Sequence, residues 1–137
     1  MDQAAALPFR ILPGIANMAG EAVDVLLVTS RDTGRWVLPK GNIETGETLA
    51  AAAAREAVEE AGASGAVASI AIGSYRYAKR DGAAGERSVA VFALRVHDLA
   101  ADWPERKVRE RQWFSRAQAA KLVEEADLAA LIAGFHG

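Results

Sequence analysis

The chain has 137 residues, of which 51% are hydrophobic and 25% are charged, and it carries a net charge of -2. This size and composition indicate one ordinary globular domain over residues 1–137. The small negative charge excludes a general attraction to nucleic acid or to anionic membranes, so an anionic ligand needs local cations or a metal. The absence of cysteine excludes disulfides, zinc–thiolate sites and thiol nucleophiles.

No apolar run approaches the roughly 20 residues of a membrane span, so we expect no membrane association. The first residues, Met1, Asp2 and Gln3, carry an acid where a signal peptide carries lysine or arginine. We therefore expect a cytoplasmic protein.

The first half of the chain predicts two strands and a helix. Residues 22–30 are short and rich in valine and leucine, as in a buried strand, and residues 31–34 are typical of a turn. A second strand is expected over residues 35–38. Residues 48–61 contain no glycine or proline and many good helix formers, which predicts a helix closed by Gly62.

The second half predicts further strands over residues 67–77 and 88–96, joined by a polar loop. A short strand is expected over residues 112–114. Ser115, with Gln118 three residues later, forms a capping-box pattern that predicts a last helix reaching Ile132. Strands that surround two helices favour an α/β (α+β) domain, an α/β/α sandwich with a central mixed sheet.

Three carboxylates share one face of the expected central helix. Glu56, Glu59 and Glu60 are three and four residues apart, and residues at this spacing lie side by side on a helix. The residues on the other side of the helix are expected to pack on the sheet: Ala54, Ala57, Val58 and Ala61. Because like charges this close repel, a hard cation such as Mg²⁺ among them would stabilise the group. The alternative is a solvated acidic face, which is common for this pattern alone.

The residues around this face follow a fixed spacing. The series is Gly41, Glu47, Arg55, Glu56, Glu59, Glu60 and Gly62. It resembles the signature of the Nudix hydrolases, G-x5-E-x7-R-E-U-x-E-E-x-G-U, at all seven fixed positions. The two aliphatic positions hold Ala57 and Ala63, which are smaller than the usual residues.

The resemblance implies a role for each of these positions. Glu56 and Glu60 are expected to bind Mg²⁺, for which Mn²⁺ can substitute, with a backbone carbonyl of Lys40 or Gly41 as a further ligand. Glu59 is expected to deprotonate or orient the attacking water, although members of the family differ in which glutamate is the base. Glu47 and Arg55 resemble the family's structural ion pair. The implied reaction is attack of water on a pyrophosphate bond without a covalent intermediate.

Further segments resemble the branch of diphosphoinositol polyphosphate phosphohydrolases and their bacterial relatives, which also act on dinucleoside polyphosphates. These segments are residues 26–41, 73–75, 90–92, 102–105 and 111–114. For such anionic substrates we expect phosphate-binding cations at Arg31, Arg35, Lys40, Lys79 and Arg109, with Arg80 and Arg87 nearby; each could instead be a solvated surface residue. Residues 2–5 (Asp-Gln-Ala-Ala) lack the basic cluster of the eukaryotic diphosphoinositol enzymes, which leaves a nucleoside polyphosphate equally plausible.

Aromatic residues and other substrates give alternatives. Tyr75 or Tyr77 could stack a base, or both could be ordinary strand residues on one face of the sheet. Trp36, Trp113 and Phe114 are expected to anchor the core. The alternative functions are a pyrophosphohydrolase for nucleoside triphosphates or RNA 5′ ends, which the acidic balance does not favour, and a non-catalytic binding module, which the intact glutamates disfavour.

Overall fold

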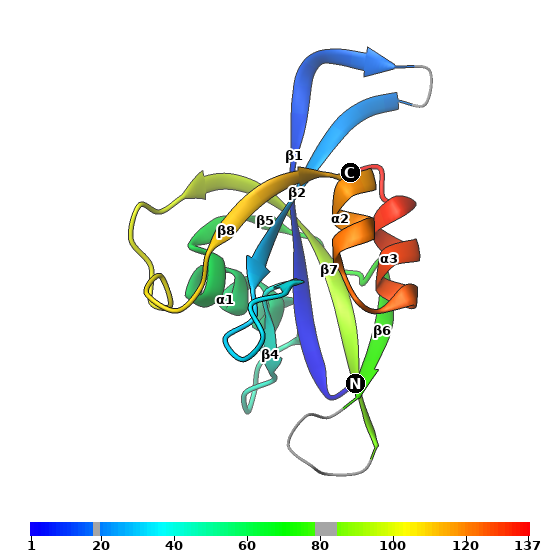
Figure 1. Cartoon of the computed structure of the whole chain (residues 1–137). Helices are drawn as coiled ribbons and strands as arrows, with labels where there is room; N and C mark the ends of the chain where they lie inside the picture. The colour runs from blue at the N-terminus through cyan, green and yellow to red at the C-terminus, as the bar shows by residue number, and fades with distance from the viewer. Residues whose placement is uncertain (18–19, 79–84) are drawn as a thin grey trace.

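The computed structural model describes residues 1–17, 20–78 and 85–137. It is a three-layered α/β/α sandwich, with α1 on one side of a mixed sheet and α2 and α3 on the other (Figure 1). The predicted fold class is therefore confirmed. None of the helices within the described residues is long and apolar enough to cross a membrane.

The sheet is built around β1 (Gln3–Asn17). Its main strand order is β3-β2-β1-β7-β5, formed by β2 (Gly20–Thr29), β3 (Trp36–Val37), β5 (Ala63–Val67) and β7 (Glu86–Leu99). Outside this path, β4 (Lys40–Asn42) pairs with β1, β6 (Gly73–Ala78) with β7, and β8 (Arg111–Ser115) with β2. The β1–β7 pair is parallel and the other pairs are antiparallel, which makes the sheet mixed.

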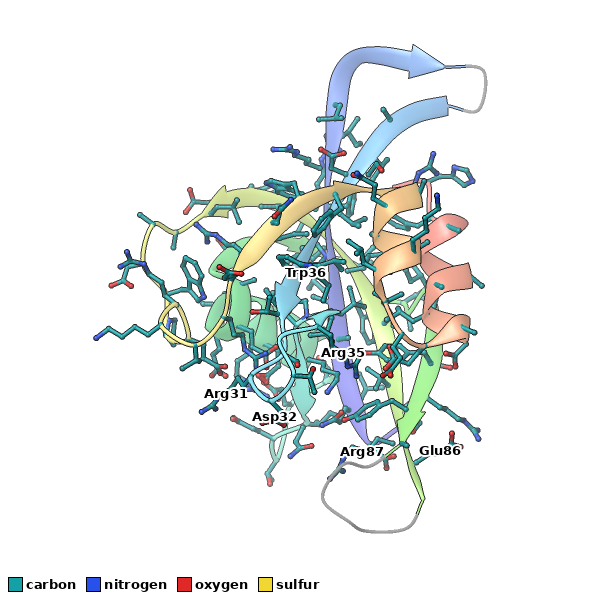
Figure 2. The ribbon with its side chains drawn as sticks, viewed as in Figure 1. Arg31, Asp32, Arg35, Trp36, Glu86 and Arg87 are labelled. Carbon is teal, nitrogen blue, oxygen red and sulfur yellow. The ribbon has the colours of Figure 1, made fainter. Side chains whose placement is uncertain are left out.

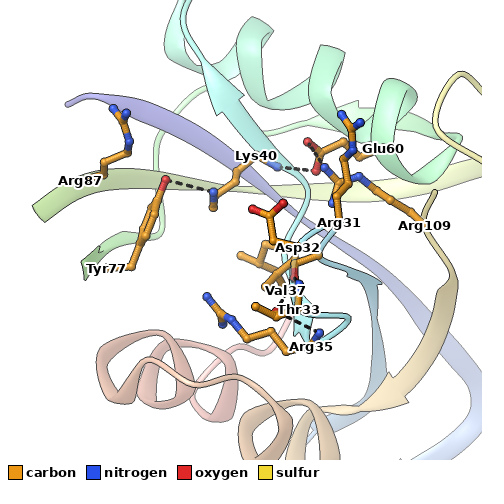
Figure 3. A pocket seen from close by; sticks show the side chains of 12 residues that line it. Arg31, Asp32, Thr33, Arg35, Val37, Lys40, Glu60, Tyr77, Arg87 and Arg109 are labelled. Carbon is orange, nitrogen blue, oxygen red and sulfur yellow. Dashed lines mark hydrogen bonds and ion pairs between the residues drawn. The ribbon is translucent and has the colours of Figure 1, made fainter. Parts of the chain in front are cut away.

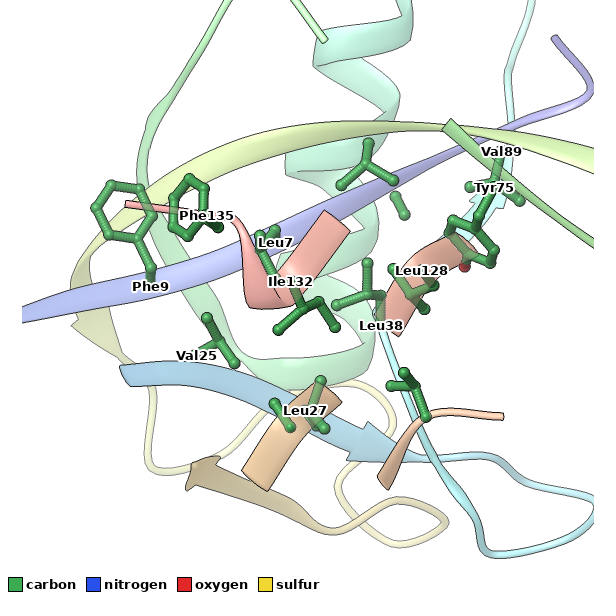
Figure 4. Packing of buried hydrophobic residues seen from close by; sticks show 14 of the residues in the cluster. Leu7, Phe9, Val25, Leu27, Leu38, Tyr75, Val89, Leu128, Ile132 and Phe135 are labelled. Atoms are coloured by element: carbon green, nitrogen blue, oxygen red, sulfur yellow. The ribbon is translucent and has the colours of Figure 1, made fainter. Parts of the chain in front are cut away.

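Both faces of the sheet are buried because side chains alternate between them. On β2, Val25 and Leu27 face the core under α2 and α3, whereas Leu26 and Val28 face the core under α1. The first of these two cores is shown in Figure 4, where Leu7 and Leu27 of the sheet face Leu128 and Ile132 of α3. The two cores fix all three helices against the sheet.

The three helices are α1 (Leu49–Ala61), α2 (Arg116–Leu122) and α3 (Ala126–Ala133). Thr48 caps α1 by accepting a hydrogen bond from the backbone N–H of Ala51, and Gly62 ends it in the left-handed conformation with φ of 64°. These are the ends that the sequence predicts.

Three sequence expectations were wrong, and one strand was not predicted. The strand expected over residues 67–77 is two strands, β5 and β6, with no strand between them. The last helix is two helices, because Val123 leaves helical geometry with ψ of 146°. Val58 does not pack on the sheet but is 44% exposed, because the buried face of α1 is formed by smaller alanines together with Glu56 and Glu60.

The fourth difference is that β1 was missed. Proline is rare inside central strands, so Pro8 argues against one. In the structure, Pro8 lies between the pairing of Ala5 with Lys40 on β4 and the pairing of Phe9 with Val25 on β2. It therefore stands where β1 changes partners on that side, and its missing N–H interrupts neither of these two ladders.

Candidate active site

Helix α1 presents the three glutamates in two environments. Glu56 and Glu60 are buried, with exposed fractions of 6% and 7%. The Glu59 side chain is 41% exposed. Two carboxylates therefore lie under the surface and the third faces the solvent beside them.

Strand β4 passes directly over the two buried carboxylates. The backbone N–H of Lys40 donates to Glu60 Oε1 at 3.2 Å. A Cβ atom on Gly41 would overlap the carboxylate of Glu56. Glycine at position 41 thus allows the close approach between the strand and the helix that brings backbone and carboxylate oxygens together.

Arg55 and Glu47 connect the loop before α1 to the helix. Arg55 donates from Nε and Nη2 to the two carboxylate oxygens of Glu47, at 2.8 and 2.9 Å, and from Nη2 to the carbonyl of Asn42 at 2.9 Å. This bidentate pairing lowers the pKa of Glu47 to about 2. Arg55 Nη1 also lies 3.5 Å from Glu56 and 3.6 Å from both Glu59 and Glu44, so one guanidinium contacts four glutamates.

The loop that follows β7 and the first residue of β8 hold the C-terminal end of α1. The last carbonyls of a helix have no partner within the helix. Here the carbonyl of Glu60 accepts from Trp103 Nε1 at 3.0 Å, and that of Ala61 accepts from Arg111 Nη1 at 2.8 Å. The Arg111 guanidinium in turn stacks on the Trp103 ring at 3.9 Å. Both ends of the acidic helix are therefore fixed.

The two buried glutamates are poor acids in this setting. Burial, followed by the charge of Glu60, raises the pKa of Glu56 to about 7. Burial also raises the pKa of Glu60 to about 7, although the Arg109 guanidinium 3.2 Å away opposes the shift. Two buried carboxylates whose negative charge the protein does not fully neutralise would be stabilised by a cation placed between them.

The donor atoms fit a hard divalent cation, but they do not enclose one in this arrangement. Across residues 1–17, 20–78 and 85–137, no group of three or more acidic or histidine side chains surrounds a possible metal position. In this arrangement Arg55 contacts Glu59 and Arg109 contacts Glu60. The oxygens of Glu56 and Glu60, with the adjacent backbone of β4, are of the type that Mg²⁺ prefers.

A cavity of about 510 Å³ opens beside Glu60, a volume typical of sites for small molecules. It is lined by Ser30, Arg31, Asp32, Thr33, Arg35, Val37, Leu38, Lys40, Glu60, Tyr77, Arg87 and Arg109 (Figure 3). Glu60 is thus the member of the acidic face that reaches this cavity. Arg31, Asp32 and Arg87 lie toward the same end of the sheet in Figure 2.

The cations expected to bind phosphates differ in their availability. The side chains of Arg31 and Arg87 line the cavity without a hydrogen bond or an ion pair to any residue that the structure describes. Lys40 Nζ donates to the Tyr77 hydroxyl at 3.1 Å and lies 4.3 Å from the centre of that ring. Lys79 and Arg80 fall outside the described residues.

The other two predicted cations are bound to protein groups. Arg109 donates to Glu105, Glu60 and the carbonyl of Thr29, at 2.7, 3.2 and 3.0 Å. Arg35 Nη2 donates to Glu125 at 3.2 Å. Both still line the cavity, so each can meet a ligand only from a position set by its carboxylate partner.

Three polar residues at or beside this site were not singled out as functional from the sequence: Gln3, Asp32 and Asn42. Asp32 brings an acid to the cavity wall. The Tyr77 hydroxyl donates to Gln3 Oε1, and Gln3 Nε2 donates to Asn42 Oδ1 at 3.1 Å. These hydrogen bonds link β4 to β6 (Lys40 to Tyr77), β6 to β1 (Tyr77 to Gln3) and β1 back to β4 (Gln3 to Asn42). Because these strands are far apart in sequence, no local sequence signal could reveal the contacts. Only the turn composition around Asp32 marked a loop able to carry a functional residue.

The aromatic residues have mostly structural positions. Tyr75 is buried in the core under α3, whereas Tyr77, on the same face of β6, lines the cavity. Trp36 packs edge-on against Phe114 with ring centres 4.9 Å apart. Trp113 packs against the core under α1. The expectation that Trp36, Trp113 and Phe114 anchor the core is confirmed.

An acidic helix thus lies beside a cavity lined by several cations, within an α/β/α sandwich. The chain belongs to the NUDIX family: the model of the NUDIX domain matches residues 10–135. Enzymes of this family, the Nudix hydrolases, act on pyrophosphate bonds and generally use divalent metals.

Among curated proteins, the chain is 33% identical over 127 residues to Nudix hydrolase 12, mitochondrial, of Arabidopsis thaliana, covering 85% of this chain and 63% of that protein. It is 33% identical over 104 residues to diphosphoinositol polyphosphate phosphohydrolase 2 of Rattus norvegicus, covering 74% of this chain and 55% of that protein. The chain thus spans less than two thirds of the length of both relatives. Because one of them is described as mitochondrial, the expected cytoplasmic location stays a prediction.

Among solved structures, the Ap4A hydrolase of C. elegans superposes with a TM-score of 0.69 at 21% identity, covering 96% of this chain and 92% of that chain. At this identity the similarity establishes the fold. The mixed sheet and its helical layers are therefore those of a NUDIX domain.

Proposed function

We propose that the protein is a Mg²⁺-dependent pyrophosphohydrolase, with Mn²⁺ as a substitute, that cleaves a phosphoanhydride bond of a polyphosphorylated small molecule by attack of water. The observation that carries the proposal is the position of Glu56 and Glu60. They are buried together under the backbone of Lys40 and Gly41, with pKa values of about 7, next to a cavity with basic residues.

Each residue of the acidic face has a part in this reaction. Glu56, Glu60 and a carbonyl of Lys40 or Gly41 would hold the dication, which neutralises phosphate charge and acidifies water when bound. Glu59, the exposed member, accepts the proton of the attacking water. A bond forms between the water oxygen and one phosphorus, and the bond from that phosphorus to the bridging oxygen breaks, releasing the other phosphate with the electron pair. Arg55 holds Glu59 and Glu56 in register.

The cavity supports a substrate with a short run of phosphates and a part rich in hydroxyl groups. Among the described cations of the cavity, Arg31, Lys40 and Arg87 have no carboxylate partner and can bind phosphates as point charges or forks, and Arg35 and Arg109 can do so from positions set by their partners. Asp32 repels a dense cluster of phosphates but accepts hydrogen bonds from hydroxyl groups. This favours a dinucleoside polyphosphate over a diphosphoinositol polyphosphate, the two substrate classes that the sequence suggests.

A substrate panel tests the proposal. Release of phosphate or nucleotide would be measured from diadenosine polyphosphates, diphosphoinositol polyphosphates, nucleoside triphosphates and RNA 5′ ends, with Mg²⁺, with Mn²⁺ and with a chelator. We expect turnover that requires the cation and is fastest on a diadenosine polyphosphate. Absence of turnover on every substrate would favour the non-catalytic binding module instead.

A further inference from the structure

Glu125 occupies an unusual position at the start of α3. It is the N-cap residue of that helix, yet its side chain makes no capping hydrogen bond. The corresponding residues of α1 and α2, Thr48 and Ser115, both cap with their side chains. Glutamate is not among the residues preferred at this position. The carboxylate of Glu125 is directed to another partner, Arg35, at 3.2 Å.

The position of Glu125 is set by the packing of the C-terminal helices on the sheet. Val123 and Leu128, on either side of it, are buried in the core. Asp127 accepts a hydrogen bond from the backbone N–H of Arg76 on β6, at 3.0 Å. The Glu125 side chain itself is only 10% exposed. The packing of the helices therefore holds the Glu125 carboxylate in one position, facing Arg35.

Arg35 joins this fixed carboxylate to the cavity. Within the residues that the structure describes, only Nη2 of its guanidinium forms a hydrogen bond, to Glu125, and Nη1 lies 3.5 Å from Glu124. Nε and Nη1 are buried and have no hydrogen-bond partner within the described part of the chain. A buried donor without a partner is costly, and a phosphate oxygen is a strong acceptor for a guanidinium. Arg35 thus has two ion pairs, with Glu124 and Glu125, and still has hydrogen-bond donors that are not used, at Nε and Nη1.

We propose that Glu125 is a positioning residue that holds the Arg35 guanidinium at the cavity wall, where Arg35 binds a phosphate of the ligand. The inference rests on the proposed function for the identity of the ligand as a phosphoanhydride. It makes the C-terminal helix pair part of the binding site, although the acidic face lies on α1. Glu125 acts only through Arg35 and does not touch the ligand.

The test uses Glu125→Asp, because this change separates position from stability. Aspartate is a better N-cap than glutamate, so α3 is kept or stabilised, but its carboxylate is withdrawn by one carbon–carbon bond, about 1.5 Å, from Arg35. Binding of inorganic pyrophosphate would be measured by calorimetry in the presence of a chelator. The same measurement would be made on Arg35→Ala, on the double variant Arg35→Ala/Glu125→Asp, and on Asp98→Asn, a matched control at an exposed position.

We expect Arg35→Ala and Glu125→Asp each to weaken pyrophosphate binding about tenfold or less, with no fall in melting temperature for Glu125→Asp. Asp98→Asn should bind as the wild type does. In the Arg35→Ala background, Glu125→Asp should have no further effect. Glu125→Gln, which removes the charge at constant length, should also weaken binding.

Four results would overturn the inference. They are wild-type binding by Arg35→Ala, unchanged or tighter binding by Glu125→Asp, an effect of Glu125→Asp that persists without Arg35, and no pyrophosphate binding by the wild type. Tighter binding would mean that Glu125 competes with the ligand for Arg35. Pyrophosphate binding that follows the expected order without turnover on any substrate would leave this inference standing and refute only the proposed hydrolysis.

Discussion

Single residues determine how closely the backbone of β4 approaches the acidic face. Gly41 lies against Glu56, and even a methyl group in its place would overlap the Glu56 carboxylate. The neighbouring Lys40 N–H fixes Glu60 from the same strand. The spacing between backbone oxygens and carboxylates therefore depends on the absence of one side chain.

This predicts that Gly41→Ala impairs the site more than the fold. The added Cβ must displace the Glu56 carboxylate or β4, and a displacement of about 1 Å can cost on the order of 100-fold in rate. The matched control is Gly134→Ala, whose Cβ would meet only Ala130 O at an ordinary 3.5 Å. Initial rates and melting curves of both variants check this. Equal activity of the two variants would contradict the importance of the close approach.

At the scale of elements, α1 depends on the loop after β7 as well as on its own caps. The indole N–H of Trp103 satisfies the carbonyl of Glu60, a residue of the acidic face. Arg111 and the backbone N–H of Glu105 satisfy the neighbouring carbonyls of Ala61 and Glu59. The loop thus ties the end of the helix that carries two of the three glutamates.

Trp103→Phe should lower the free energy of unfolding by the contribution of the hydrogen bond from Trp103 Nε1 to the Glu60 carbonyl. Phenylalanine keeps an aromatic ring under Arg111 but leaves the Glu60 carbonyl without its donor, at a cost of about 1 kcal/mol, or about 4 °C in melting temperature. Trp113→Phe serves as the control, because the Trp113 indole makes no hydrogen bond within the described residues. A melting temperature equal to that of the wild type would show that water replaces the indole without cost.

The parts of the fold that could be predicted from the sequence are those that depend on residues close to one another in the chain. The start of α1 at Thr48, its end at Gly62 and the Ser115 cap of α2 each depend on residues within one helical turn. Strand β1 was missed because its burial comes from β2, β4 and β7, which the chain brings together from distant positions. The break between α2 and α3 also follows from packing, since Val123 turns into the core.

The candidate site divides in the same way. The acidic face could be predicted because Glu56, Glu59 and Glu60 lie on one helix. Which arginines are paired with carboxylates could not be predicted, because the partners are distant in sequence. Arg35 pairs with Glu125, 90 residues away, and Arg109 pairs with Glu60, 49 residues away. Lys40 and Tyr77 likewise meet only through the order of the strands.

At the scale of the whole molecule, the buried glutamates couple stability to pH. For Glu56 and Glu60 the pKa in the folded protein is about 7, against an ordinary value of 4.5. Below pH 4.5 both residues are protonated in the folded and unfolded states. Between pH 4.5 and 7 the folded state retains protons that the unfolded state has released, so folding stability falls as pH rises. Glu47, with its lowered pKa, acts with the opposite sign and only below pH 4.5.

The metal-free protein should therefore lose melting temperature, on the order of 5 °C, when the pH is raised from 5 to 8. Glu56→Gln, which cannot ionise, should reduce this dependence. Millimolar Mg²⁺ at pH 8 should restore the melting temperature of the wild type, since a ligand that binds only the folded state stabilises it. Melting curves in chelator and in Mg²⁺ provide the measurement. A melting temperature that does not change with pH would show that burial does not raise the pKa values of these glutamates.

The central claim is that the acidic face of α1 carries out cleavage of a phosphoanhydride. Its most direct test is the initial rate on the best substrate of the panel, at saturating Mg²⁺, for the wild type, Glu56→Gln, Glu59→Gln and the exposed control Asp98→Asn. We predict a loss of about 100-fold or more for both glutamate variants, with melting temperatures in chelator no lower than that of the wild type, and full activity for the control. Full activity of Glu56→Gln and Glu59→Gln would contradict the claim.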